Sequence, residues 1–506
     1  MPRQVAILHG WSDTSKSFEP LVNFLDENGF DPVPVWLGDY ISLDDDVRIE
    51  DVAKRMQQVV QDKISREGLA APFDMIVHST GGLVARQWLG DYYPDGQNCP
   101  VKRLVMLAPA NFGSKLAAMG QSMLGRLIKG WNNWFHTGKE MLKELELASP
   151  YQWDLAQRDL FGPDPLHPGS SPYGGNGVWP FVIIGTHPYA SGLRQAINEN
   201  GSDGTVRAAA ANLNARGVTI DFASNEESPL TTLWRSRYGD LVFPFAILPD
   251  RDHGSIIDPA SQGYSSDAPT QGLLGKLILQ ALQCEELNRY QAMSVPTQAT
   301  LDPAFSWQSV IDASPSWADI SEATASLSRD DAERGRLFGG QPPTADYFHQ
   351  YMQVVVRVVD DHGSEVSDFY LEFFAPEAKQ NAEAIYFQAK VLEDVHPYGD
   401  NKAYRCLFVD RSDLADPTNG YYSKITPATA AKVLAMSISA VFPGGNVSYF
   451  HSTARGASGH MIVHRLLEND QASRWLKRNC THFVEIIIPR VPKDGVFTLT
   501  RLPRGR

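Results

Sequence analysis

The N-terminal part of the chain alternates between short apolar runs and amphipathic stretches, and this alternation limits the possible folds more than any other feature. Apolar runs of strand length occupy residues 4–8, 33–37, 73–78 and 102–107. Between them, stretches that begin near Phe18 and Ile49 carry apolar side chains at helical spacing. Strands that alternate with helices build parallel sheets. The sequence therefore predicts an α/β domain, with helices on both faces of a mostly parallel sheet.

The sequence pattern changes after about residue 290. Before it, two more apolar runs at 181–184 and 241–248 and an apolar helix at 273–287 complete the predicted α/β domain. Beyond it, strand-like runs alternate with turn residues at 352–359, 369–374, 385–391, 404–409, 447–450, 483–488 and 496–500, and one helix is predicted at 428–438. We expect an α/β domain at 1–292 with an insert at 115–160, a linker with short helices at 293–345, and a β-rich, β-sandwich-like domain at 346–506.

Charge and composition exclude several classes of partner. The formal net charge of −14 argues against a nucleic-acid partner, because binding phosphates requires clustered Lys and Arg. The four cysteines show no metal-binding spacing, and no acidic loop has the spacing of a calcium site. We therefore expect no cofactor and no metal ion. The sequence shows neither a signal peptide nor an apolar window of about 20 residues that could span a membrane. We expect a cytoplasmic or peripherally membrane-associated protein.

Ser79 stands where the predicted strand at 73–78 gives way to a helix. It is followed by Thr80 and two glycines. A tight strand-to-helix turn with small residues pushes the serine hydroxyl out above the sheet, as in the nucleophile turn of α/β-hydrolases. The usual pattern is Gly-x-Ser-x-Gly, and Val77 replaces the first glycine. The position predicts that Ser79 is a nucleophile; a turn without chemistry is the alternative.

In α/β-hydrolases the acid and then the histidine follow the nucleophile along the chain. Asp203 lies in the loop Asn-Gly-Ser-Asp-Gly-Thr-Val after the run at 181–184, and His253 follows the run at 241–248. We predict that His253 is the general base and that Asp203 orients it. The weaker histidine candidates are His136, His167 and His187, and the competing carboxylates are Asp240, Asp250 and Asp252.

Such a nucleophile also needs backbone N–H groups that stabilise an oxyanion. The loop His-Gly-Trp directly follows the first strand, and the predicted helix begins just after Ser79. We predict that the N–H groups of Trp11 and Thr80 form the oxyanion hole. We expect the side chain of His9 to be structural.

The insert at 115–160 interrupts the sheet pattern with a helix-like stretch rich in Met and Trp. One interpretation is a lid that offers apolar surface to acyl chains or to a membrane. The other is an amphipathic cap that packs on its own domain. The residues predicted to contact the substrate or form the lid are Met123, Leu127, Trp131, Trp134 and Phe135.

Several motifs together resemble the PlaB-type bacterial phospholipases A. They are His-Gly-Trp-Ser at 9–12, His-Ser-Thr-Gly-Gly at 78–82, Leu-Ala-Pro-Ala-Asn-Phe-Gly-Ser at 107–114 and Asp-Gly-Thr-Val at 203–206. In that family a Thr stands where this chain has Val77. The resemblance covers residues 1–290 through motifs and the C-terminal region only through architecture. It implies phospholipase A and lysophospholipase A activity, bacterial origin, peripheral membrane association and self-association as a homo-oligomer.

The leading hypothesis is a serine hydrolase that releases fatty acids from phospholipids and lysophospholipids through an acyl-enzyme at Ser79. A general lipase, carboxylesterase or thioesterase could use the same three residues, because the fold does not set the substrate. A third hypothesis is a membrane- or partner-binding protein without catalysis. Labelling by a fluorophosphonate would exclude this third hypothesis.

Overall fold

A computed structural model describes most of the chain. The described residues are 2–8, 15–34, 45–118, 138–162, 170–175, 177–189, 197–259, 272–302, 304–312, 315–339, 342–374, 387–415, 434–451, 458–463 and 476–500. They form two compact units. The first contains residues 1–215, 235–353 and 478–481, and the second contains 216–234, 354–477 and 482–506.

The first unit is built on a six-stranded parallel sheet, which confirms the predicted α/β domain. Its strand order is β2-β1-β3-β4-β5-β8, and every neighbouring pair is parallel. The strands are β1 (Arg3–Leu8), β2 (Phe30–Pro34), β3 (Phe73–His78), β4 (Val101–Leu107), β5 (Trp179–Gly185) and β8 (Phe245–Leu248). All side chains of β3 and β5 are buried, as expected of central strands covered on both faces.

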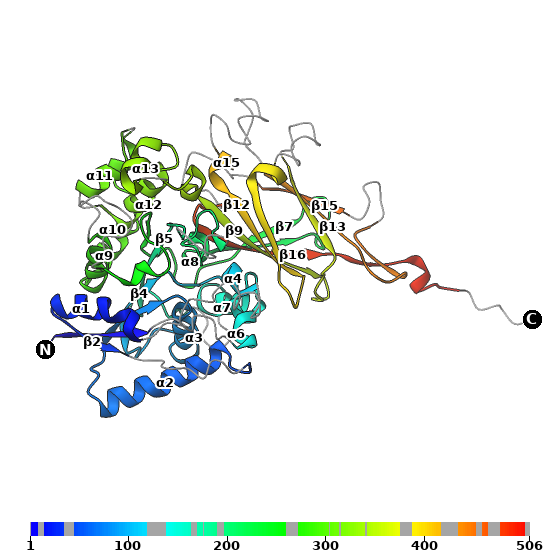
Figure 1. Ribbon diagram of the computed structural model, residues 1–506. Coiled ribbons are helices and arrows are strands. Elements are labelled where there is room, and N and C mark those ends of the chain that lie inside the picture. The colour runs from blue at the N-terminus through cyan, green and yellow to red at the C-terminus, as the bar shows by residue number, and fades with distance from the viewer. Residues whose placement is uncertain are drawn as a thin grey trace, which may run out of the picture. The chain divides into compact units, whose positions relative to one another are not determined.

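Two pairs of helices cover the sheet on opposite faces (Figure 1). The first pair is α1 (Glu19–Glu27) and α9 (Leu273–Leu282), and the second is α2 (Ile49–Arg66) and α3 (Gly81–Tyr92). In α2 the buried residues Val52, Met56 and Val60 recur at helical spacing, so one face of the helix is apolar. Within the described ranges, no helix combines the length and the apolar character that crossing a membrane requires.

Residues 293–345 contribute helices to the first unit. They include α11 (Trp307–Asp312), α12 (Trp317–Ser326) and α13 (Asp331–Phe338). α12 packs on the edge strand β8, where the hydroxyls of Ser321 and Thr324 donate to the β8 carbonyls of Phe245 and Ile247 at 3.0 and 2.7 Å. The domain boundaries at 292 and 345 stay predictions.

The second unit is β-rich, as the sequence predicts. A six-stranded sheet has the order β11 (Leu392–Pro397), β12 (Tyr404–Asp410), β9 (Tyr351–Asp360), β16 (Cys480–Ile488), β6 (Arg216–Asp221) and β7 (Leu230–Leu233). A three-stranded antiparallel sheet contains β10 (Phe369–Phe374), β13 (Leu434–Ala440) and β15 (Ser458–Val463). A two-stranded pair joins β14 (Val447–Tyr449) and β17 (Arg490–Pro492). Strands β6 and β7 come from the middle of the sequence, where no such pairing was predicted.

Three local predictions for the second unit were wrong. Of the predicted helix at 428–438, residues 428–433 lie outside the described residues and 434–438 lie in β13. In β13, Met436, Ile438 and Ala440 are buried at the two-residue period of a strand paired on both sides. Residues 387–391 were predicted as part of a strand, but Phe387–Val391 forms a π-helix. Residues 497–500, also predicted as part of a strand, form none.

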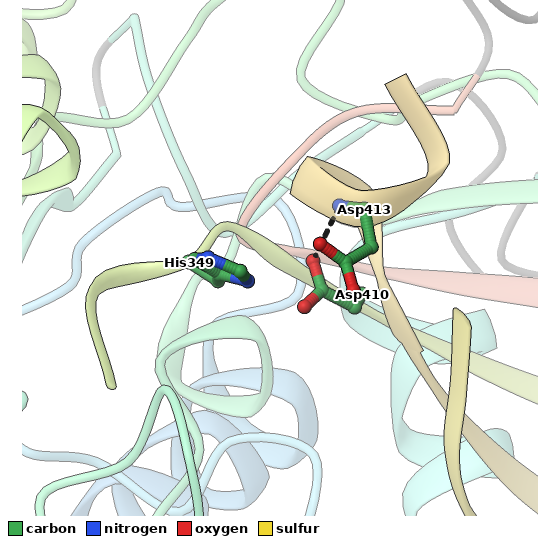
Figure 2. A group of neighbouring side chains, drawn as sticks. All are labelled: His349, Asp410 and Asp413. Carbon is green, nitrogen blue, oxygen red and sulfur yellow. Dashed lines mark hydrogen bonds between the residues drawn. The ribbon is translucent and has the colours of Figure 1, made fainter. Parts of the chain in front are cut away.

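Asp410 caps the short helix α15 (Arg411–Ala415), because its carboxylate accepts the Asp413 N–H at 3.0 Å (Figure 2). His349, also drawn there, belongs to the first unit.

Candidate active site

Ser79 follows β3 directly and has a backbone φ of +54°, in the left-handed region that side chains other than glycine rarely adopt. A Cβ on Gly82 would lie 2.6 Å from Pro109 Cβ, so only glycine fits there. A Cβ on Gly81 would lie 3.5 Å from Val77 Cβ and 3.2 Å from the Leu8 carbonyl oxygen. The contact with the Leu8 carbonyl would be tight, whereas the contact with Val77 would be an ordinary van der Waals contact, so the β1 backbone favours a small residue at Gly81.

His253 contacts both predicted partners. Its Nε2 lies 3.0 Å from Ser79 Oγ, and its Nδ1 lies 2.8 Å from Asp203 Oδ2. The His253 backbone N–H also donates to the Asp203 carbonyl at 3.1 Å. Asp203 and His253 are 0% and 1% exposed. The structure therefore joins a hydroxyl, an imidazole and a carboxylate from three distant segments in one hydrogen-bonded chain.

The Asp203 carboxylate is held by its own loop. Its Oδ1 accepts the N–H groups of Thr205 and Val206 at 2.9 and 2.7 Å, which leaves Oδ2 directed at His253. The loop is anchored by Glu199, which pairs with Arg207 at 2.8 Å and with Lys115 at 3.0 Å. Burial alone would raise the pKa of Glu199, but these two cations lower it below its ordinary value. Glu199 therefore keeps the charge that fixes the loop.

The competing carboxylates have other surroundings. Asp240 is exposed. Asp252 accepts the N–H groups of Gly254 and Ser255 at 3.0 and 2.8 Å and so shapes the turn that carries His253. Asp250 lies 3.9 Å from Arg251, and burial raises its pKa to about 6 despite that cation. The carboxylate that bonds to the His253 imidazole is that of Asp203.

Of the weaker candidates for the general base, only His187 lies within the described residues, and it contacts other groups. His187 Nδ1 bonds to the Pro188 carbonyl at 2.7 Å, and its ring packs on Phe338 with the centroids 5.4 Å apart. Burial lowers the pKa of His187. His136 and His167 lie outside the described residues.

Only part of the predicted oxyanion hole can be placed. Thr80 is buried and stands at the N-terminus of α3, where backbone N–H groups and the helix dipole favour an anion. Trp11 and the rest of the loop at 9–14 lie outside the described residues.

The predicted lid residues also lie outside the described residues. They are Met123, Leu127, Trp131, Trp134 and Phe135. After the gap the chain continues as α6 (Lys139–Leu145) and α7 (Pro150–Asp159), whose apolar faces are buried.

Comparison with known proteins defines the class. A family model of alpha/beta hydrolases matches residues 5–263, which is more than half of the chain. The chain therefore belongs to the alpha/beta hydrolase family. Its fold is similar to that of the phospholipase PlaB from Legionella pneumophila, with a TM-score of 0.73 and 23% identity over 100% of this chain and 97% of that chain. PlaB in complex with thio-NAD gives a TM-score of 0.71 and 24% identity over the same shares. The predicted fold class and the resemblance to PlaB-type hydrolases are confirmed.

The structure is less similar to that of the lipase BlEst2 from Bacillus licheniformis. The TM-score is 0.34 and the identity is 14%, over 56% of this chain and 93% of that chain. A search of curated protein sequences finds no match.

Sequence reasoning missed some residues around the site. His78 was part of the motif but was given no role, although it lies against His253. Arg86 and Asp159 form a buried ion pair beside the loop at 108–113. A charged residue inside the helix that follows Ser79 was the available signal for Arg86. Nothing local to Asp159 indicates its partner.

Proposed function

We propose that this chain is a serine-dependent carboxylic-ester hydrolase with phospholipase A and lysophospholipase A activity. The observation that carries the proposal is the hydrogen-bonded chain from Ser79 through His253 to Asp203, at the carboxyl ends of the parallel strands. Ligands of open α/β sheets bind in that region.

The mechanism follows from the geometry. As Ser79 Oγ attacks the acyl carbonyl carbon, His253 Nε2 takes the hydroxyl proton and then gives it to the departing glycerol oxygen. A water molecule then attacks the carbonyl carbon of the acyl-enzyme while His253 takes its proton. His253 returns this proton to Ser79 Oγ as the bond between Oγ and the acyl carbon breaks, and the fatty acid leaves. Asp203 keeps the Nδ1–H of His253 in place and stabilises the imidazolium. The N–H groups of Thr80 and Trp11 would stabilise the oxyanion.

The substrate class rests on two further observations. The fold similarity to the phospholipase PlaB extends over the whole chain, and the segment at 119–137 carries the Met and Trp residues expected of an acyl-chain or membrane surface. Peripheral membrane association and a homo-oligomer are part of the same proposal. Co-sedimentation with phosphatidylglycerol vesicles tests the first, and light scattering tests the second.

The activity is tested by fatty-acid release from phosphatidylglycerol, phosphatidylcholine, their lyso forms and a triglyceride, for the wild type and Ser79→Ala. We expect release from the phospholipids, and a loss of about 10⁶-fold in the variant. Cleavage of short-chain esters or thioesters alone would leave the hydrolase and exclude the phospholipid substrate. Equal, trace release by both proteins would contradict the assignment of Ser79.

A further inference from the structure

His78 is the last residue of β3 and directly precedes Ser79. Its side chain is 2% exposed and lies against His253, with the two ring centroids 4.8 Å apart at an interplanar angle of 42°. The ring of Phe18 packs edge-on against His78, with the centroids 5.9 Å apart. His78 is thus held between a fixed aromatic ring and the histidine that contacts Ser79.

A hydrogen bond joins the two histidines. His78 Nε2 lies 3.1 Å from the backbone carbonyl oxygen of His253. A carbonyl oxygen can only accept, so His78 Nε2 carries the proton and donates it. The bond is buried, where the loss of a donor leaves the acceptor without its partner and costs more than at the surface.

This bond closes a short ring of interactions. His78 is bonded covalently to Ser79, His78 Nε2–H holds the backbone of His253, and His253 Nε2 returns to Ser79 Oγ at 3.0 Å. Two further bonds of His253, from its N–H and its Nδ1, lead to Asp203. Those two orient the imidazole relative to the Asp203 loop, whereas the bond from His78 fixes the same residue relative to the strand that carries the nucleophile.

We propose that His78 is a positioning residue for the proposed reaction, and that its Nε2–H holds His253 at its working distance from Ser79. The inference rests on the proposed function. Proton transfer between Oγ and Nε2 needs a short, aligned contact, and a displacement of about 1 Å can lower the rate by about 10²-fold.

A matched pair of substitutions tests the role. In His78→Gln a side-chain amide can replace the Nε2–H donor, whereas His78→Met has a similar length and no donor. We expect kcat for a phospholipid or short-chain ester to fall about 10²-fold in His78→Met, with KM nearly unchanged, and to stay within about fivefold of the wild type in His78→Gln. The rate at which a fluorophosphonate labels Ser79 should follow kcat.

The control is Phe18→Leu, which changes the packing around His78 and keeps the donor. It should lower the melting temperature and leave kcat within about twofold. Equal losses in the Gln and Met variants at matched melting temperatures, or full activity in both, would overturn the positioning role. Should His78→Met not fold, the pair His78→Gln and His78→Leu repeats the comparison. A wild type without activity and without labelling at Ser79 would instead overturn the proposed function.

Discussion

Two carboxylates of the first unit, Asp159 and Asp203, are both 0% exposed, yet their surroundings differ. Asp159 is bonded to Arg86 through both of its oxygens, at 2.8 and 2.9 Å, and accepts the Tyr173 hydroxyl at 2.8 Å. Asp203 accepts two backbone N–H groups and the imidazole of His253. One carboxylate faces a permanent cation, and the other faces a group that can gain and lose a proton.

The difference suggests two tasks for buried carboxylates: Asp159 stabilises the fold through its ion pair, and Asp203 serves the proposed reaction. A guanidinium does not release its proton, so the charge of Arg86 stays fixed. Burial alone would lower the pKa of Arg86, and the Asp159 carboxylate raises it above its ordinary value. Arg86 also donates to the Asn111 carbonyl at 2.5 Å, in the loop where the Ala110 N–H meets the Ser79 carbonyl. We therefore expect the pair to stabilise the loop at 108–113, which contacts Ser79, and to take no part in the proposed proton transfer.

The largest expected effect is that of Asp203→Asn. The amide keeps the shape of the side chain but loses the charge that holds the His253 tautomer. We expect kcat to fall about 10⁴-fold, as for the equivalent change in a Ser-His-Asp enzyme. The melting temperature should change by only a few degrees. Steady-state kinetics and thermal unfolding of the same preparation check both values; a kcat within tenfold of the wild type would contradict the role of Asp203.

The matched substitution Asp159→Asn should have the opposite profile. It leaves the Arg86 guanidinium buried without its counter-ion, so we expect the free energy of unfolding to fall by about 3–5 kcal/mol. The folded fraction should keep kcat within a few-fold. Urea unfolding and active-site titration measure the two quantities. A large loss of kcat in fully folded protein would mean that the two carboxylates do not divide the tasks in this way.

A smaller effect is expected for Tyr173→Phe, which removes one donor to the Asp159 carboxylate and leaves Arg86 in place. We expect the free energy of unfolding to fall by about 1.5–3 kcal/mol, the range for a hydrogen bond to a charged group. The control is Tyr151→Phe, because the Tyr151 hydroxyl donates to the neutral Gln87 Oε1 at 3.0 Å. Its loss should be nearer 1 kcal/mol. Equal losses would show that the charge of Asp159 adds nothing.

A third carboxylate, Glu144, gives the smallest effect. Burial raises its pKa to about 8; the neighbouring Glu50 adds to this, and the Ile49 N–H, which donates to Glu144 at 2.7 Å, opposes it. Between its ordinary pKa and 8, the folded state holds a proton that the unfolded state has lost. Its contribution to stability is therefore complete at low pH and is lost as the pH rises through about 8.

Glu144→Gln should remove this dependence on pH. Because Glu144 is partly solvated, the effect on stability should be small, roughly 1 kcal/mol. As the pH rises from 5 to 9, we expect the melting temperature of the variant to increase by about 2–4 °C relative to that of the wild type. Thermal unfolding of both proteins at several pH values checks it. A constant difference between variant and wild type would contradict the raised pKa.

The sequence predicted the residues whose signals are local. Ser79 directly follows β3 and His253 lies in the loop after β8, and parallel strands bring such ends to one edge of the sheet. Asp203 lies farther along the chain beyond β5, in a short motif of its own. The pair of Arg86 and Asp159 could not be predicted in this way, because its two members are far apart in the sequence and neither lies in a motif.

The same contrast holds for the fold. Buried α/β units have clear periodicity, whereas β6 pairs with β16 and β13 lies between two distant strands. These pairings depend on contacts between segments that are separate in the sequence, and at 434–438 they overrode the helical pattern.

The most direct test of the central claim is to find the serine that reacts. The protein is treated with a fluorophosphonate, digested, and the modified peptide is identified by mass spectrometry. We expect the adduct on Ser79 alone, with labelling at least about 10²-fold slower in His253→Ala and Asp203→Asn. An adduct on another serine, or labelling of Ser79 that does not depend on His253, would contradict the assignment of these three residues.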